Sequence, residues 1–230
     1  MSTIASRVQV TCQRIADAAR AAGRAPDSVR LVAVSKSFPP EAVRAAHAAG
    51  QADFGENYLQ EALAKMRALA DLPLTWHFIG PIQGNKAAAV AENFAWVHSV
   101  DREKIAERLA CSRPDAAAPL NVCVQVNVGG ENSKSGVAPG EAPALARLVR
   151  GLPRLRLRGL MTVPRPTADA AGQRAQFRML REMLEQLNAE GMGLDTLSMG
   201  MSEDLEAAIA EGATLLRVGT AIFGQRMRKT

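Results

Sequence analysis

Short apolar segments rich in β-branched residues alternate with longer segments rich in alanine and charged residues along almost the whole sequence. A further helix is expected before the first strand, where Ile4, Val8, Ile15 and Ala18 recur at helical spacing. Strict alternation of strand and helix requires parallel strands joined by crossover helices. The predicted strands are 31–35, 52–55, 75–79, 95–99, 120–128, 155–162, 196–198 and 215–218, and the helices that follow the first seven are 39–49, 58–70, 85–92, 101–111, 141–150, 168–189 and 203–210.

Eight strands within 230 residues predict an α/β fold of the (β/α)8, or TIM, barrel type. The alternative is a doubly wound open sheet, but no GxGxxG motif follows the first strand to support it. The longest connections, 112–119 and 129–140, are rich in Pro, Ala, Gly and Ser, and neither resembles a domain boundary. We therefore predict a single domain over residues 1–230.

The positive charge of the chain does not favour nucleic-acid binding. The formal net charge is +5, but the basic residues are dispersed, and the cluster Arg154, Arg156 and Arg158 alternates with leucine as in a strand with one charged face. Aromatic residues make up 4% of the chain and do not interleave with the basic clusters, so bases would have no platform on which to stack. We expect no nucleic-acid partner.

The cysteines and the hydropathy pattern indicate a cytoplasmic protein. Cys12, Cys111 and Cys123 are widely spaced and form no CxxC pair, which argues against both a disulfide framework and a zinc site. Each lies in an apolar stretch, so buried thiols are expected. No segment approaches the roughly 18 unbroken apolar residues of a membrane span.

In a barrel of this kind the functional residues follow the strands, at the C-terminal face. Lys36 closes the apolar run VAVSK, which would place its amine at the barrel mouth. Desolvation there favours the neutral amine, the nucleophile that forms a Schiff base with an aldehyde. The alternative is a lysine that extends from the strand end into solvent, as most such lysines do.

Two glycine-containing segments after the last two strands suggest a phosphate site. The first is SMGMS at 198–202, with Ser198 and Gly200, and the second is Gly219-Thr220 after the eighth strand. Barrels often bind phosphate there through backbone N–H groups. Ser202 could equally be a plain helix N-cap, and Glu203 and Asp204 would repel a phosphate unless they point away.

Arginine and histidine side chains add further candidates. Arg217 lies two residues before Gly219, and it could donate a hydrogen bond to a ring nitrogen of a cofactor or form an ion pair with Glu56. His77 and His98 lie in apolar runs, where a lone histidine is more often a core residue than a ligand. No HxH or HExxH pattern indicates a metal site.

Several long motifs resemble the pyridoxal 5′-phosphate (PLP) homeostasis proteins, the YggS/PROSC group, in the same order along the chain. They are LVAVSK at 31–36, FGENYLQE at 54–61, WHFIGPIQGNK at 76–86, ENSKSG at 131–136, LRLRGLM at 155–161, LSMGMSEDLEAAI at 197–209 and LRVGTAIFG at 216–224. The resemblance implies a fold-type III PLP barrel, like the N-terminal domain of alanine racemases.

The resemblance also implies how the cofactor is held. Lys36 matches the Schiff-base lysine and Arg217 the arginine that faces the pyridine nitrogen. Asn57 and His77 match polar residues beside the ring. The phosphate-binding positions are matched by Ser198, Gly200, Gly219 and Thr220.

The family is known for PLP binding rather than for an established catalytic turnover, so a PLP carrier or reservoir is expected, with no catalytic residues. The alternative is an amino-acid racemase of the alanine racemase type. Such racemases use a lysine and a tyrosine from a second, β-rich domain, whereas the sole tyrosine here, Tyr58, lies near the second strand. A sugar- or nucleotide-phosphate enzyme is a third possibility. Apo forms of PLP enzymes are the expected partners, the protein is expected to be a monomer, and Lys134 could offer a second PLP site.

Overall fold

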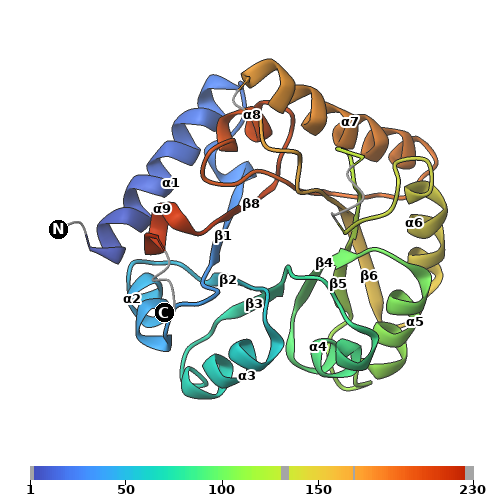
Figure 1. Ribbon diagram of the computed structural model, residues 1–230, viewed down its shortest axis with the longest axis horizontal. Coiled ribbons are helices and arrows are strands. Elements are labelled where there is room, and N and C mark those ends of the chain that lie inside the picture. Colours follow the sequence, from blue (N-terminus) through green and yellow to red (C-terminus); the bar gives the residue numbers. More distant parts are fainter. Residues whose placement is uncertain (1–2, 131–134, 168, 226–230) are drawn as a thin grey trace.

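The computed structural model describes residues 3–130, 135–167 and 169–225, and in it eight parallel strands close into a barrel with helices on the outside (Figure 1). Each strand pairs with the next along the sequence, and β8 pairs with β1 through registers such as Val32 with Arg217. The predicted barrel is confirmed, and the open sheet is excluded. The strands are β1 (Arg30–Val34), β2 (Asp53–Glu56), β3 (Thr75–Phe78), β4 (Trp96–Val100), β5 (Leu120–Gln125), β6 (Leu155–Met161), β7 (Thr196–Ser198) and β8 (Leu215–Val218).

The helices and strands follow the predicted order, but several of their bounds differ from the prediction. A short helix that was not predicted, α9, follows β8 directly, α8 begins at Leu205 rather than near Glu203, and β5 ends at Gln125 rather than at Val128. Val126 continues β5 only as an isolated bridge to Val137. The helices are α1 (Ile4–Ala21), α2 (Pro40–Ala48), α3 (Leu59–Ala68), α4 (Ala87–Asn93), α5 (Glu103–Ser112), α6 (Ala142–Gly151), α7 (Ala170–Ala189), α8 (Leu205–Ala210) and α9 (Thr220–Phe223).

The strands read as almost continuous apolar runs because both of their faces are covered. In β1, Leu31 to Val34 are all buried. Alternate residues point outward to the helices, where most of the core lies, and inward to the barrel. A separate apolar cluster inside the barrel consists of Val32, Trp96, Cys123, Met161 and Leu215.

The extra N-terminal helix α1 packs beside α8 and α9 (Figure 1). Thr3 caps it by accepting a hydrogen bond from the Ser6 N–H, and its buried face includes Val8, Ile15 and Ala19. Arg14 donates to the Ser202 carbonyl in the loop between β7 and α8, and it pairs with Glu206 on α8. The helix therefore braces a loop at the C-terminal mouth of the barrel.

One expectation about side chains is wrong, and another concerns a residue outside the described part of the chain. Cys123 is buried, but Cys12 and Cys111 are exposed, because each lies on the outward face of an amphipathic helix. Lys134 lies outside the described residues. Within the described ranges, no helix combines the length and the apolar character needed to cross a membrane.

Candidate functional site

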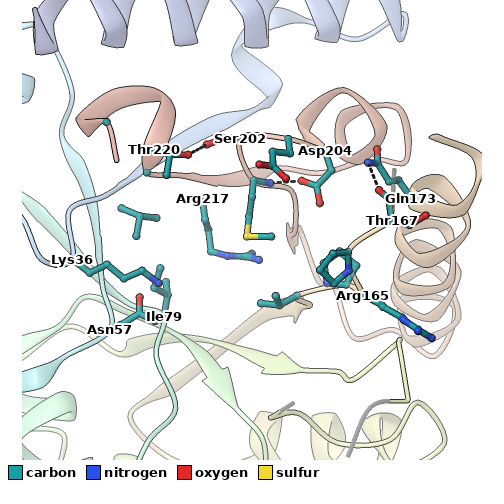
Figure 2. Close-up of a pocket in the computed structure, with 18 of the residues that line it drawn as sticks. Lys36, Asn57, Ile79, Arg165, Thr167, Gln173, Ser202, Asp204, Arg217 and Thr220 are labelled. Atoms are coloured by element: carbon teal, nitrogen blue, oxygen red, sulfur yellow. Dashed lines mark hydrogen bonds between the residues drawn. The ribbon is translucent and has the colours of Figure 1, made fainter. Parts of the chain in front are cut away.

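A cavity of about 700 Å³ opens at the C-terminal mouth of the barrel. Its wall includes Lys36 after β1, Asn57 after β2, Arg217 on β8, and Gly219 and Thr220 after β8. Figure 2 shows Lys36 and Arg217 extending into the same space, with Asn57 beside Lys36. The fold thus brings together five of the eight residues expected at a cofactor site.

Side chains of α3 hydrogen-bond to the turn that carries Lys36. Lys65, buried on α3, donates to the Ser35 carbonyl at 2.7 Å and to carboxylate oxygens of Glu56 and Glu61 at 2.7 and 2.6 Å. Glu61 also accepts from the Ser37 N–H at 2.6 Å, and Ser37 has a φ of 67°, which is uncommon for a residue other than glycine. The backbone on both sides of Lys36 is therefore fixed by one charged cluster.

Glu56 is the buried acid of this cluster. It accepts from Lys65 and from the Ser35 hydroxyl, and its side chain is fully inaccessible. Burial raises the pKa of Glu56, and the Lys65 ammonium only partly offsets that effect. The lysine pairing also shows that the predicted alternative of an ion pair between Arg217 and Glu56 is wrong.

Arg217 forms the opposite wall and is held by neutral acceptors. Its Nη1 donates to the Ser198 hydroxyl and its Nη2 to the Thr162 carbonyl, both at 2.7 Å. Burial lowers its pKa to about 10, against the attraction of Asp204. The guanidinium remains charged at neutral pH, and as a group that only donates it suits an acceptor atom in the cavity.

The loops after β7 and β8 meet on a third side of the cavity. The Thr220 hydroxyl donates to the Ser202 hydroxyl at 3.1 Å, and Gly219 lies so close to β1 that a Cβ there would be 3.2 Å from the Val34 carbonyl oxygen. Ser202 is not a helix N-cap as one interpretation had it, since Asp204 occupies that position before α8. The Asp204 carboxylate accepts from the Met201 N–H, so this acid is engaged within its own loop.

Three of the predicted cofactor residues, Ser198, His77 and Gly200, are not among the residues that line the cavity. The Ser198 hydroxyl is fully buried between Arg217 and His98. His77 is also fully buried and bonds to His98 and Asp53. Gly200 has a φ of 94°, and a Cβ there would lie 2.6 Å from side-chain atoms of α8 and β8, so both the turn and the packing require glycine at this position.

Other residues at the site were not identified from the sequence. Lys65 and Asp53 look like ordinary helix and strand charges, and the role of Thr162 depends on its backbone carbonyl. His98 was interpreted as a core histidine, which its full burial supports. Of these residues only Lys65 has a recognisable sequence pattern, because it follows Glu61 by four residues, which is the spacing of an ion pair on a helix.

The cavity has the donors and acceptors that PLP requires. Asn57 lines the cavity, and its buried Oδ1 accepts no hydrogen bond from any described residue. Lys36 supplies an amine, Arg217 a donor for a pyridine nitrogen, and the first N–H groups of α9 lack acceptors within that helix. The residues present therefore fit this cofactor.

The two histidines below the cavity predict a pH dependence of stability. Burial lowers the pKa of His98 well below its ordinary value, and nearby His77 and Arg217 add to the effect. Burial likewise lowers the pKa of His77, although Asp53 opposes it. Below about pH 6.5 the unfolded chain takes up protons that the folded chain excludes. The free energy of unfolding should therefore fall with decreasing pH below that value, by up to about 1.4 kcal/mol per pH unit for each ring.

Urea denaturation at several pH values between about 7 and 5.5 would measure this slope. The variant His98→Gln keeps a donor and an acceptor but does not titrate, so its slope should be smaller than that of the wild type. Equal slopes would show that His98 is not held neutral.

Comparison with known proteins places the chain among PLP-related barrels. Residues 11–227 match the family described as "Alanine racemase, N-terminal domain". A pyridoxal phosphate homeostasis protein of Pseudomonas aeruginosa is 65% identical over 226 residues, which cover 98% of this chain and 97% of that protein. The motif resemblance found in the sequence is thereby confirmed.

Solved structures agree with this placement. PipY of Synechococcus elongatus, solved without PLP, is 42% identical with a TM-score of 0.82 and covers 91% of this chain and 100% of its own. The same protein with PLP bound gives 41% identity and a TM-score of 0.80. Alanine racemase of Corynebacterium glutamicum shares the fold at 16% identity and a TM-score of 0.71, and the alignment covers 97% of this chain and 63% of that chain.

Proposed function

Since this chain belongs to the family of pyridoxal phosphate homeostasis proteins, we propose that it binds PLP through Lys36 and takes part in PLP homeostasis. The observation that carries the proposal is the cavity in which Lys36, Asn57 and Arg217 meet. PipY, a relative with the same barrel, has been solved with PLP bound.

Each wall of the cavity has a role in this proposal. PLP supplies an aldehyde, with which the Lys36 amine condenses to a Schiff base with loss of one water molecule. Arg217 donates to the pyridine nitrogen, and Asn57 contacts the ring. Gly219, Thr220 and Ser202 hold the phosphate through N–H and hydroxyl donors. Ser198, Gly200 and His77 do not line the cavity, and in this proposal they support the residues that do.

We propose a carrier or reservoir that delivers PLP to apo-enzymes, rather than a racemase. Racemisation at a carbon requires bases on both of its faces, and Tyr58, the sole tyrosine, is 54% exposed and is not among the residues that line the cavity. The large apolar side chains exposed on the described surface, Val10, Tyr58 and Met179, are scattered, which supports a monomer. We further propose that residues 1–230 act as one domain in the cytoplasm, where free thiols are usual.

Borohydride reduction after incubation with PLP tests the central claim. Reduction fixes the Schiff base, so peptide mass mapping should find the pyridoxyl group on Lys36, and Lys36→Ala should lose both this label and the visible absorbance of the bound cofactor. Lys104→Ala, which removes an exposed lysine on α5, should keep both. A wild-type protein that stays colourless and unlabelled would refute the proposal.

The carrier assignment has its own decisive outcome. D- and L-alanine are incubated with the PLP-loaded protein in deuterated solvent, and exchange of the α-proton is followed by NMR. Exchange on both enantiomers faster than about 1 per second, within the range of ordinary enzymes, would establish the racemase instead.

A further inference from the structure

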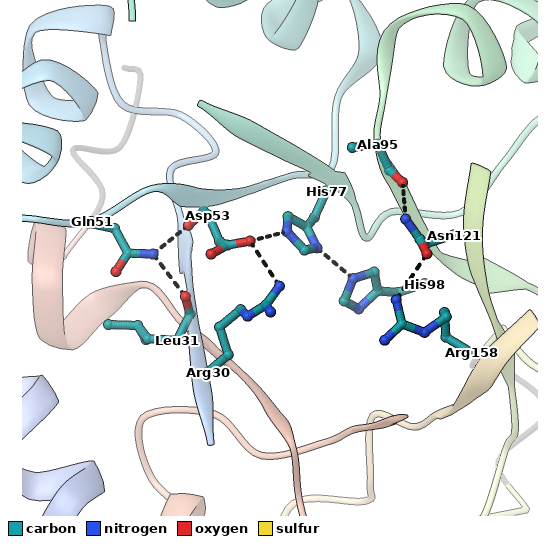
Figure 3. Close-up of polar contacts among 9 residues, drawn as sticks. All are labelled: Arg30, Leu31, Gln51, Asp53, His77, Ala95, His98, Asn121 and Arg158. Atoms are coloured by element: carbon teal, nitrogen blue, oxygen red, sulfur yellow. Dashed lines mark hydrogen bonds and ion pairs between the residues drawn. The ribbon is translucent and has the colours of Figure 1, made fainter. Parts of the chain in front are cut away.

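A continuous hydrogen-bond network runs through the barrel interior from Arg217 to the opposite mouth. Arg217 Nη1 lies 2.7 Å from Ser198 Oγ, which is 2.7 Å from His98 Nδ1. His98 Nε2 lies 2.9 Å from His77 Nδ1, and His77 Nε2 lies 2.9 Å from Asp53 Oδ1. We call these five side chains the interior network; Figure 3 shows the part from Asp53 to His98.

The middle of the interior network is buried, and only its ends are partly exposed. Ser198, His98 and His77 are completely buried, and Arg217 is 4% exposed. Asp53 is the first residue of β2, at the N-terminal mouth, where its side chain is 16% exposed and lies 3.7 Å from Arg30. Trp96 stacks on the His77 ring with centroids 5.5 Å apart and an interplanar angle of 14°, which fixes the plane of that ring.

The two ends determine the direction of every hydrogen bond between them. An arginine only donates, so Ser198 Oγ accepts from it, and an ionised aspartate only accepts, so His77 carries its proton on Nε2. With neutral rings, His77 Nδ1 must accept from His98 Nε2–H, and His98 Nδ1 must accept from the Ser198 hydroxyl. All four hydrogen bonds therefore point from Arg217 toward Asp53.

We propose that this network positions the Arg217 guanidinium, and that Ser198, His98 and His77 are positioning residues for PLP binding. The inference rests on the proposed function. Arg217 hydrogen-bonds within the described structure to two neutral acceptors, Ser198 and Thr162, so a rotation toward another acceptor would break two buried bonds. The network adds rigidity because the direction of each of its hydrogen bonds is consistent with only one direction for the next.

Histidine ¹⁵N NMR on the PLP-free protein tests the polarity directly. Both His77 and His98 should be neutral and protonated on Nε2. A proton on Nδ1 of either ring would overturn the inference whatever the protein binds.

The effect on the cofactor is tested by cutting the network at Ser198, which does not line the cavity. Ser198→Ala should raise the Kd for PLP about tenfold or more, as expected for a hydrogen bond to a charged group, while the reducible label still maps to Lys36. Thr196→Val removes a buried hydroxyl two residues earlier on the same strand, which bonds Asp195 outside the network, and should leave the Kd unchanged. A wild-type Kd for Ser198→Ala would overturn the positioning role.

Asp53→Asn provides a second variant, at the N-terminal mouth of the barrel and away from the cavity. The amide keeps the shape and can still accept from His77, but the negative charge at the end of the interior network is lost. We expect weaker PLP binding and a visible spectrum whose pH transition lies at lower pH, because added net positive charge favours the unprotonated Schiff base. An unchanged Kd together with an unchanged transition would overturn the inference.

The outcomes separate the two proposals. If the wild type binds PLP on Lys36 but Ser198→Ala and Asp53→Asn behave like it, only the positioning role fails. If the wild type does not bind PLP, the proposed function fails, and the positioning role fails with it.

Discussion

Lys65→Met is expected to lower the free energy of unfolding by about 3–5 kcal/mol, the usual cost of removing one partner of a buried ion pair. Methionine retains much of the volume of the lysine but leaves Glu56 as an unpaired buried acid and removes one of the two donors to the Ser35 carbonyl, the other being the Phe38 N–H. Because the same cluster holds the turn around Lys36, the affinity for PLP should fall as well. Urea denaturation and a PLP titration measure the two effects.

A double-mutant cycle shows whether the pair itself is responsible. Adding Glu56→Gln to Lys65→Met removes the uncompensated acid and should recover part of the lost stability. Lys104→Met, on the exposed face of α5, should change stability by less than about 0.5 kcal/mol. If Lys65→Met also stayed within that range, the cluster would not be what holds the turn.

Gly159→Ala is expected to be at least as damaging, with a loss above about 4 kcal/mol or no folded protein at all. Gly159 on β6 pairs with Thr196 on β7, and a Cβ at position 159 would lie 1.8 Å from the Thr196 carbonyl oxygen. The contact is with backbone, so the two strands would have to separate. Soluble yield and thermal unfolding measure the result.

Gly151→Ala is the matched control. Gly151 ends α6, has no atom within 4 Å of an added Cβ, and does not have a positive φ. Alanine there should leave stability unchanged or raise it by up to about 1 kcal/mol. A Gly159→Ala protein as stable as this control would mean that β6 and β7 can separate without cost.

The barrel and the residues on its rim could be predicted from sequence because both depend on local patterns. Alternating apolar and helical segments define the strands, and strand ends define the rim, so Lys36, Asn57 and Gly219 were placed correctly at the mouth. The short α9 was missed because Thr220–Phe223 has the length of a single turn. The start of α8 was misplaced because Ser202 resembles an N-cap, whereas Asp204 takes that position.

Depth inside the barrel could not be predicted in the same way. Ser198 and His77 share the apolar context of cavity residues, but whether an inward side chain reaches the cavity or lies below it depends on the stagger between strands. The interior network illustrates this, since its members come from β2, β3, β4, β7 and β8 and no spacing along the sequence connects them. Likewise, Lys65 pairs with Glu56 across two elements, and only the Glu61 contact is local.

The pairing of β8 with β1 has a consequence for synthesis of the protein. Lys36 leaves the ribosome before Arg217 and Gly219, and the two sides of the cavity meet only when β8 pairs with β1. Closing so long a loop is slow, and intermediates that lack β8 leave the edge of β1 unpaired. A nascent chain therefore has both sides of the cavity in place only after the ring of strands has closed.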